Sequence, residues 1–178
     1  MENQYGTRNI HLVGLMGSGK TTLGRSLAKR LELEFVDSDR EIESRTGVGI
    51  PTIFEIEGED GFRKREAQVI AAITCLSGNV VATGGGVILR PENCVNLRAS
   101  GFVVYLDVPP NTLLERTRHD KNRPLLQVAD PLMKLKELYA QRDALYRETA
   151  DLVIEGGHLN AQGILQLLIK EYRERWKL

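Results

Sequence analysis

Short apolar runs and longer amphipathic stretches alternate along the whole chain. The apolar runs of strand length predict five β-strands, at residues 9–14, 34–38, 79–86, 102–108 and 151–156. The stretches between them show helical spacing, as in residues 20–32, where Leu23, Leu27 and Leu31 recur at every fourth position. This alternation is typical of an α/β protein.

The predicted helices occupy most of the remaining chain. We expect them at residues 20–32, 39–76, 91–101, 109–120 and 132–150, and in a closing segment that contains Leu165, Leu168, Tyr172 and Trp176. Gly47, Gly49 and Pro51 interrupt the second of these regions, and residues 121–131 form a polar loop. We therefore predict a five-stranded, mostly parallel sheet with helices on both faces.

The length of 178 residues suits one domain with a single core, spanning residues 1–178, and no internal repeat or linker divides it. In sheets of this kind, ligands bind beyond the carboxyl ends of the strands. Functional residues are therefore expected in the loops that follow residues 13, 36, 83, 108 and 154.

Composition narrows the classes of function. The 24 acidic residues balance the 24 basic ones, which argues against a general nucleic-acid surface. No apolar run approaches the length of a membrane span, and the first ten residues lack the apolar core of a signal peptide. Cys75 and Cys94 form no CxxC pair and suggest no disulfide framework. We expect a cytoplasmic protein without nucleic-acid or membrane partners.

The first strand-end loop, "GLMGSGKTT" (14–22), satisfies the pattern GxxxxGK[ST] with Gly14, Gly19, Lys20 and Thr21. Such a loop wraps phosphates with backbone N–H groups, while the lysine reaches the β- and γ-phosphates and the hydroxyl ligates Mg²⁺. A glycine turn that merely opens a helix is the alternative. The chain lacks the DxxG and NKxD companions of GTPases, which favours ATP.

Two aspartates follow the second predicted strand. If that strand ends at Phe35–Val36, side-chain alternation points Asp37 and Asp39 to the same side. They would then either serve one site or belong to a turn, where Ser38 or Asp39 would cap a helix beginning near Arg40.

Further candidates for binding a second substrate follow along the chain. The glycines Gly84–Gly86 would allow close approach of the backbone to a ligand, or form a flexible turn. Arg63 would bind a ligand, or pair with Glu66 across one helical turn. Arg142 lies in the long helix, where a solvated arginine is the simplest alternative. The basic loop "RTRHDKNRPLL" (116–126) would be a charged turn, or a lid that excludes water and brings Arg123 to the phosphates.

Taken together, these motifs resemble those of the shikimate kinase family over residues 8–170. The matching segments are "GLMGSGKTTLGRSLA" (14–28), "FVDSDREIE" (35–43), "IPTIFEIEGEDGFRKRE" (50–66), "ATGGG" (82–86), "RPLL" (123–126) and "RDALYRETAD" (142–151). The resemblance implies a P-loop kinase fold with a mobile lid at about 116–131. It also implies phosphorylation of the 3-hydroxyl of shikimate with ATP and Mg²⁺, giving shikimate 3-phosphate and ADP. We further expect a monomer.

The resemblance also implies roles for individual residues. The catalytic residues would be Lys20, Asp39 and Arg123. ATP would be bound by Gly17, Ser18, Gly19, Lys20, Thr21, Thr22, Arg116 and Arg123. Thr21 and Asp37 would serve Mg²⁺. Shikimate would be bound by Asp39, Arg63, Gly84, Gly85, Gly86 and Arg142, the two arginines gripping its carboxylate.

The chain departs from the family pattern in two places. Thr21 stands where many members have serine, and both hydroxyls serve magnesium. In "EGGHLNAQG" (155–163), where some members have an arginine near adenine, we expect His158 to be a loop residue and transfer no contact. The rival hypotheses are another small-molecule kinase, for gluconate or a nucleoside monophosphate, and a nucleotide-binding regulatory module without turnover.

Overall fold

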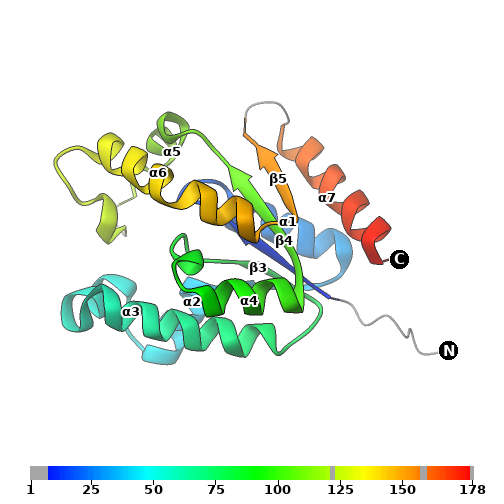
Figure 1. The fold of residues 1–178 in the computed structure, drawn as a ribbon, viewed down its shortest axis with the longest axis horizontal. Coiled ribbons are helices and arrows are strands. Elements are labelled where there is room, and N and C mark those ends of the chain that lie inside the picture. The colour runs from blue at the N-terminus through cyan, green and yellow to red at the C-terminus, as the bar shows by residue number, and fades with distance from the viewer. Residues whose placement is uncertain (1–7, 121–122, 157–159, 177–178) are drawn as a thin grey trace.

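The structure is a computed structural model that describes residues 8–120, 123–156 and 160–176. In these residues, one parallel sheet is formed by β1 (Asn9–Val13), β2 (Glu34–Asp37), β3 (Asn79–Ala82), β4 (Gly101–Asp107) and β5 (Leu152–Glu155). The spatial order is β2-β3-β1-β4-β5, so β1 lies at the centre (Figure 1). The register pairs Leu12 with Ala82 on one side and with Val104 on the other. The parallel sheet predicted from the sequence is confirmed.

Helices connect the strands and cover both faces of the sheet. They are α1 (Lys20–Leu31), α2 (Ser38–Thr46), α3 (Ile50–Thr74), α4 (Pro91–Ser100), α5 (Pro110–Thr117), α6 (Pro131–Thr149) and α7 (Ala161–Trp176), with short 3₁₀ turns η1 (Val87–Leu89) and η2 (Pro124–Leu126). On one face α1 and α7 pack against β1 and β4, and on the other face α3, α4 and α6 complete the core (Figure 1).

Local sequence signals explain several boundaries. The Asp130 side chain accepts a hydrogen bond from the N–H of Met133, and Pro131 occupies the first turn of α6, a favourable start for a helix. Gly47 ends α2 in the left-handed conformation. The predicted break between residues 47 and 51 is confirmed, and Gly58, with φ 69° and ψ −176°, adds a second break inside α3. Positive φ at this position favours glycine.

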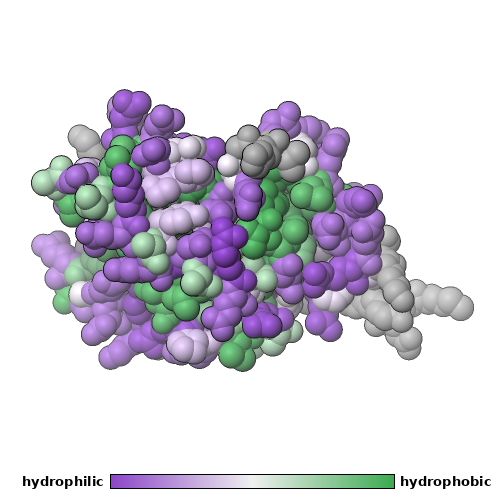
Figure 2. Space-filling model, turned by 45° about the horizontal axis from the view of Figure 1, so that its top comes forward, coloured by the Kyte–Doolittle hydropathy of each residue, from purple (hydrophilic) through white to green (hydrophobic). Residues whose placement is uncertain are grey.

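The surface side chains are predominantly hydrophilic on the face shown in Figure 2, with apolar side chains gathered between them. Among the helices of the described residues, none has the combination of length and apolar character that crossing a membrane requires.

Candidate active site

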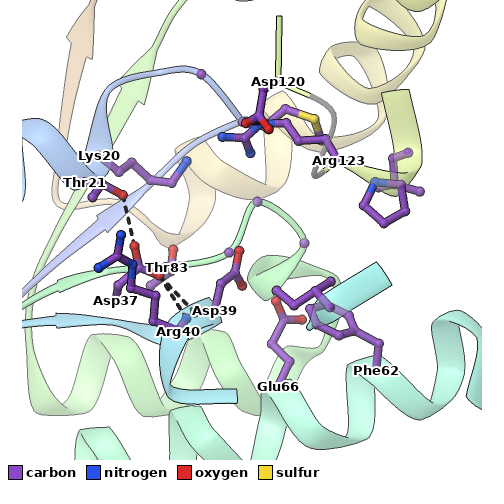
Figure 3. A pocket seen from close by; sticks show the side chains of 18 of the residues that line it. Lys20, Thr21, Asp37, Asp39, Arg40, Phe62, Glu66, Thr83, Asp120 and Arg123 are labelled. Atoms are coloured by element: carbon purple, nitrogen blue, oxygen red, sulfur yellow. Dashed lines mark hydrogen bonds and ion pairs between the residues drawn. The ribbon is translucent and has the colours of Figure 1, made fainter. Parts of the chain in front are cut away.

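A cavity of about 620 Å³ lies where the carboxyl ends of β1, β2 and β3 meet, between α3, α6 and the segment that follows α5. Loops after three of the five strands named from the sequence line it, as the rule for parallel sheets predicts. Figure 3 shows Lys20, Asp37 and Asp39 at one end of the cavity, Phe62 and Glu66 at the other, and Arg123 opposite Asp39.

The phosphate loop holds the ammonium group of Lys20 in place. Its Nζ donates to the carbonyl oxygens of Gly14 and Leu15 at 2.7 and 2.8 Å, and to Ser18 Oγ at 3.3 Å. Burial lowers the pKa of Lys20 to about 8; the positive charge of Arg123 contributes, while the charges of Asp39 and Asp37 oppose this shift. A positive charge is therefore held beside the N-terminus of α1, where a phosphate would also meet free backbone N–H groups.

Thr21 and Asp37 bring two oxygen ligands together. Thr21 Oγ1 donates to Asp37 Oδ2 at 3.0 Å, and both residues line the cavity. No cluster of three or more His, Cys, Asp or Glu side chains suited to a metal occurs in the described residues. This pair fits Mg²⁺, which binds proteins through one or two oxygen ligands and takes the others from phosphates and water.

Asp37, rather than Ser38 or Asp39, caps α2. Its Oδ1 accepts hydrogen bonds from the N–H groups of Asp39 at 3.1 Å and Arg40 at 3.3 Å. The helix begins at Ser38, one residue before the predicted helical region 39–76 and two before Arg40, so Asp39 lies in its first turn. Strand alternation cannot orient Asp37 and Asp39 alike, because the strand ends at Asp37 and Asp39 lies in α2, but both residues line the same cavity. Ser38 instead accepts a hydrogen bond at Oγ from the N–H of Gly84, at 3.0 Å.

Asp39 presents a buried carboxylate oxygen to the cavity. Within the described part of the chain, its Oδ1 has no hydrogen-bond partner. Burial raises the pKa of Asp39 to about 6; the charges of Glu66 and Asp37 add to the rise, and those of Lys20 and Arg123 oppose it. The carboxylate is a stronger proton acceptor than an exposed aspartate and can still be ionised at neutral pH.

Arg63 and Glu66 form the buried ion pair that the sequence left open as an alternative. Arg63 Nη1 donates to Glu66 Oε2 at 2.8 Å, and Nη2 donates to Glu59 Oε1 at 3.2 Å. Both Arg63 and Glu66 nevertheless line the cavity. Arg142, which is 3% exposed, lines it from α6. Pairing with Glu66 and facing a ligand are therefore compatible for Arg63.

The three glycines come close to these charged groups. A Cβ atom on Gly84 would lie 2.7 Å from Asp39 Oδ1 and 2.8 Å from Glu66 Oε1, and one on Gly86 would overlap the Arg63 guanidinium. Gly85 lies against the phosphate loop and Arg142. Glycine at 84 and 86 therefore lets the two carboxylates and the guanidinium approach the backbone, which a flexible turn alone would not require.

Two arginines lie on the α5 side of the cavity. Arg123 Nε donates to Asp120 Oδ2 at 2.8 Å, and Arg116 Nη1 donates to the carbonyl of Gly17 at 3.3 Å. Gly17, Gly19 and Thr22 line the cavity as well, whereas Ser18 is buried beneath it and accepts the bond from Lys20. His158 lies outside the described residues.

Sequence reasoning assigned no role to Phe54, Phe62, Thr83 and Met16, which also line the cavity. The rings of Phe54 and Phe62 lie 4.8 Å apart between their centroids and provide an apolar wall. Their place in the segment 50–66 was the available signal, but helical periodicity could not distinguish a wall of the site from the core.

Comparisons with known proteins agree with this geometry. A family model described as shikimate kinase matches residues 16–173. The shikimate kinase of Dechloromonas aromatica (strain RCB) is 62% identical over 165 residues, covering 93% of this chain and 90% of the relative. That of Thiobacillus denitrificans (strain ATCC 25259 / T1) is 58% identical over 160 residues, covering 90% and 87%.

Solved structures show the same similarity. The shikimate kinase from Acinetobacter baumannii in complex with shikimate has a TM-score of 0.92 and 48% identity, and the match covers 96% of each chain. The enzyme from Aquifex aeolicus vf5 has a TM-score of 0.81 and 33% identity, with 94% of this chain and 97% of that one covered.

Proposed function

Since this chain belongs to the shikimate kinase family, we propose that it transfers the γ-phosphoryl group of ATP to the 3-hydroxyl of shikimate. The products are shikimate 3-phosphate and ADP, and the reaction is a step of chorismate and aromatic amino acid biosynthesis. The observation that carries the proposal is one cavity that joins a phosphate loop to two buried arginines, Arg63 and Arg142, and to the carboxylate of Asp39.

ATP occupies the half of the cavity formed by Gly17–Thr22. The N–H groups of this loop and the ammonium of Lys20 bind its phosphates, and Arg123 approaches them from the opposite side. Arg116, which already contacts the carbonyl of Gly17, lies against adenine. The Mg²⁺ ion that accompanies ATP would be held by Thr21 directly and by Asp37 through water, and it would neutralise phosphate charge.

Shikimate occupies the other half. Its carboxylate meets the guanidinium groups of Arg63 and Arg142, which are suited to bidentate pairing with a planar anion. Its hydroxyl groups donate to Asp39 and meet the backbone of Gly84–Gly86. Asp39 and Glu66 each have a buried oxygen without a hydrogen-bond partner in the described residues, and hydroxyl donors of the substrate would satisfy such oxygens.

The chemical step follows from these positions. The 3-hydroxyl oxygen attacks the γ-phosphorus, its proton passes to Asp39, and the bond from the γ-phosphorus to the β,γ-bridging oxygen breaks to release ADP. Lys20 and Arg123 stabilise the charge that moves onto the bridging and γ-oxygens. Arg63 and Arg142 contribute by holding the acceptor in line with the bond that breaks.

Residues 116–131 act as a lid in this proposal, closing over both substrates so that water does not accept the phosphoryl group. The chain acts as one domain of 178 residues, a monomer in the cytoplasm without nucleic-acid or membrane partners. The balanced charge and the hydrophilic face in Figure 2 support this setting.

An ADP-release assay with shikimate, quinate and gluconate in parallel tests the proposal. We expect rapid turnover with shikimate, much slower turnover with quinate and none above background with gluconate, which lacks the cyclic frame that places a carboxylate and a hydroxyl at opposite ends of the cavity. Preference for gluconate would indicate the rival small-molecule kinase. ATP binding without turnover on any acceptor would indicate a regulatory module.

A further inference from the structure

Tyr146 is a buried side chain that the roles above leave unused. It lies on α6, one helical turn beyond Arg142, and none of its surface is exposed. Its hydroxyl donates a hydrogen bond to the carbonyl oxygen of Gly85, 61 residues earlier in the chain. A long-range bond therefore ties α6 to the glycine loop.

The carbonyl of Gly85 belongs to the peptide that joins Gly85 to Gly86. Neither glycine has a Cβ atom to restrict its backbone, so this peptide needs contacts from outside to keep one orientation. The peptide that joins Thr83 to Gly84 is held as well, because the N–H of Gly84 donates to Ser38 Oγ at 3.0 Å. Tyr146 thus supplies a second tether on the loop, on the α6 side.

Arg142 faces the same hydroxyl. Burial raises the pKa of the Tyr146 phenol, and the nearby Arg142 guanidinium opposes this rise, so the two groups are close enough to interact. A Cβ atom on Gly85 would lie 3.7 Å from Arg142 Nη1. Tyr146, Gly85 and Arg142 therefore meet at one point beside the cavity.

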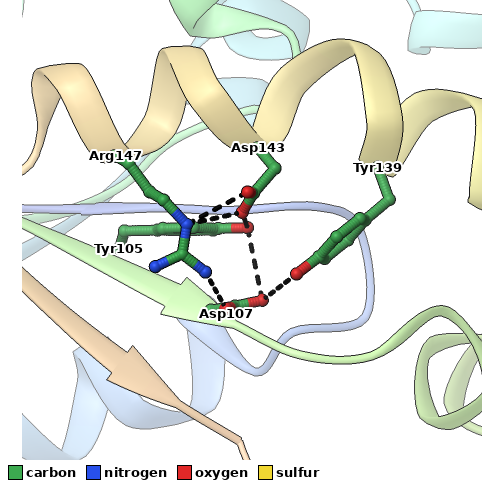
Figure 4. A network of polar contacts seen from close by, with 5 residues as sticks. All are labelled: Tyr105, Asp107, Tyr139, Asp143 and Arg147. Atoms are coloured by element: carbon green, nitrogen blue, oxygen red, sulfur yellow. Dashed lines mark hydrogen bonds and ion pairs between the residues drawn. The ribbon is translucent and has the colours of Figure 1, made fainter.

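The ring of Tyr146 is held in place by packing against β4. It stacks on Tyr105 of β4, with 4.7 Å between the ring centroids and 25° between the planes. The hydroxyl of Tyr105 donates to Asp143 Oδ1 at 3.0 Å, within a network that also contains Asp107, Tyr139 and Arg147 (Figure 4). The network joins α6 to the carboxyl end of β4, because Tyr139 donates to Asp107 Oδ1 at 2.9 Å and Arg147 pairs with both aspartates.

We propose that Tyr146 is a positioning residue that holds the Gly85–Gly86 peptide and Arg142 at a fixed separation. The carboxylate-binding and hydroxyl-binding parts of the acceptor site then keep the spacing of one shikimate molecule. The inference rests on the proposed function for the identity of the acceptor, but the tether itself does not depend on the acceptor.

The variant Tyr146→Phe tests the proposal because it keeps the ring and its stacking and removes the hydroxyl. We expect the shikimate KM to rise about tenfold, as one lost hydrogen bond to a binding element implies, while the KM for ATP stays within about twofold. Tyr172→Phe is the matched control. Tyr172 is also buried, and its hydroxyl donates to the carbonyl of Arg8 at 2.9 Å. Arg8 directly precedes β1, at the amino end of the sheet and away from the cavity.

Hydrogen exchange on the protein without substrates gives a second readout. We expect exchange in a peptide covering residues 83–90 to accelerate about tenfold in Tyr146→Phe and to stay unchanged in Tyr172→Phe. Unchanged exchange there would overturn the tether, and an unchanged shikimate KM in a variant of an active wild type would overturn its role in binding. Equal rises in both KM values would show a general structural effect and also overturn the proposal. Failure of the wild type to use shikimate would refute the proposed function alone, because the exchange experiment needs no acceptor.

Discussion

The two ends of the sheet bury polar side chains in different ways. At the amino end, Asn9 Oδ1 accepts hydrogen bonds from the backbone and side-chain N–H groups of Asn79 at 3.0 and 3.2 Å, and Asn9 Nδ2 donates to the carbonyl of Leu76 at 2.8 Å. At the carboxyl end, Asp39 Oδ1 and Glu66 Oε1 are buried without a hydrogen-bond partner in the described residues, as are the Nε atoms of Arg63 and Arg142.

This difference separates polar groups buried for folding from polar groups buried for binding. A buried polar group that is paired within the protein offsets its desolvation and stabilises the fold. An unpaired one carries the desolvation cost, and where it lines the cavity it offers its bonding capacity to a ligand. His11 Nδ1 is also buried and unpaired in the described residues, but His11 does not line the cavity. Changes at the carboxyl end should therefore act on catalysis and binding, and changes at the amino end on stability.

The largest effect is expected from Lys20→Met, which removes the charge beside the phosphates. We expect kcat to fall by at least about a thousandfold, because transition-state charge loses a preorganised partner. The melting temperature should fall only modestly, because the carbonyls of Gly14 and Leu15 lose a donor while a buried charge and its desolvation cost are also removed. An ADP-release assay and a thermal scan measure both. A variant that unfolds at much lower temperature but turns over normally when folded would contradict the contrast.

Arg63→Ala should act on the acceptor. We expect the shikimate KM to rise about a hundredfold, since a charge-assisted pair contributes about 2–3 kcal/mol, while the KM for ATP stays near that of the wild type. Arg65→Ala is the control. Arg65 pairs with Glu57 at 2.5 Å, on the exposed face of the same helix. If both variants have the same shikimate KM, Arg63 does not bind the substrate.

The residues at the carboxyl end of the sheet also show which parts of the site could be predicted from the sequence. The phosphate loop was predicted residue by residue, because its chemistry lies within nine consecutive positions. The cap on α2 was predicted wrongly, since it depends on where the helix starts, and two acids and a serine compete for that role. Tyr146 was missed because its partner, Gly85, is 61 residues away. Pairing over such distances follows from the packing of the sheet and helices, and no local pattern encodes it.

At the amino end, Asn9→Ala should lower stability and leave catalysis unchanged. The substitution leaves the N–H of Asn79 and the carbonyl of Leu76 without their partner, so we expect a loss of about 2–3 kcal/mol in the free energy of unfolding. Urea unfolding gives this number, and kcat and both KM values are measured well below the melting temperature. Asn111→Ala, at an exposed position in α5, is the matched control. Altered kinetics in Asn9→Ala would break the separation of the two ends.

His11 provides the smallest effect and a dependence on pH. It is fully buried, and its Nε2 lies 2.8 Å from Ser100 Oγ, whereas its Nδ1 has no hydrogen-bond partner in the described residues. Burial lowers its pKa to about 3. An unfolded histidine has a pKa of about 6.5, so between these values the unfolded chain binds a proton that the folded chain does not. The neutral histidine therefore contributes stability above pH 6.5 that is lost as the pH falls.

Unfolding of the wild type and of His11→Leu at several pH values isolates this contribution, because the other titrating groups cancel in the difference. Between pH 7.5 and pH 5, the wild type should lose about 2 kcal/mol more than the variant, following the linkage of proton binding to unfolding. The ratio of the two kcat values should stay constant over the same range, since His11 is remote from the acceptor. Parallel stability curves would show that His11 takes up its proton while folded, and the burial at the amino end would then not keep it neutral.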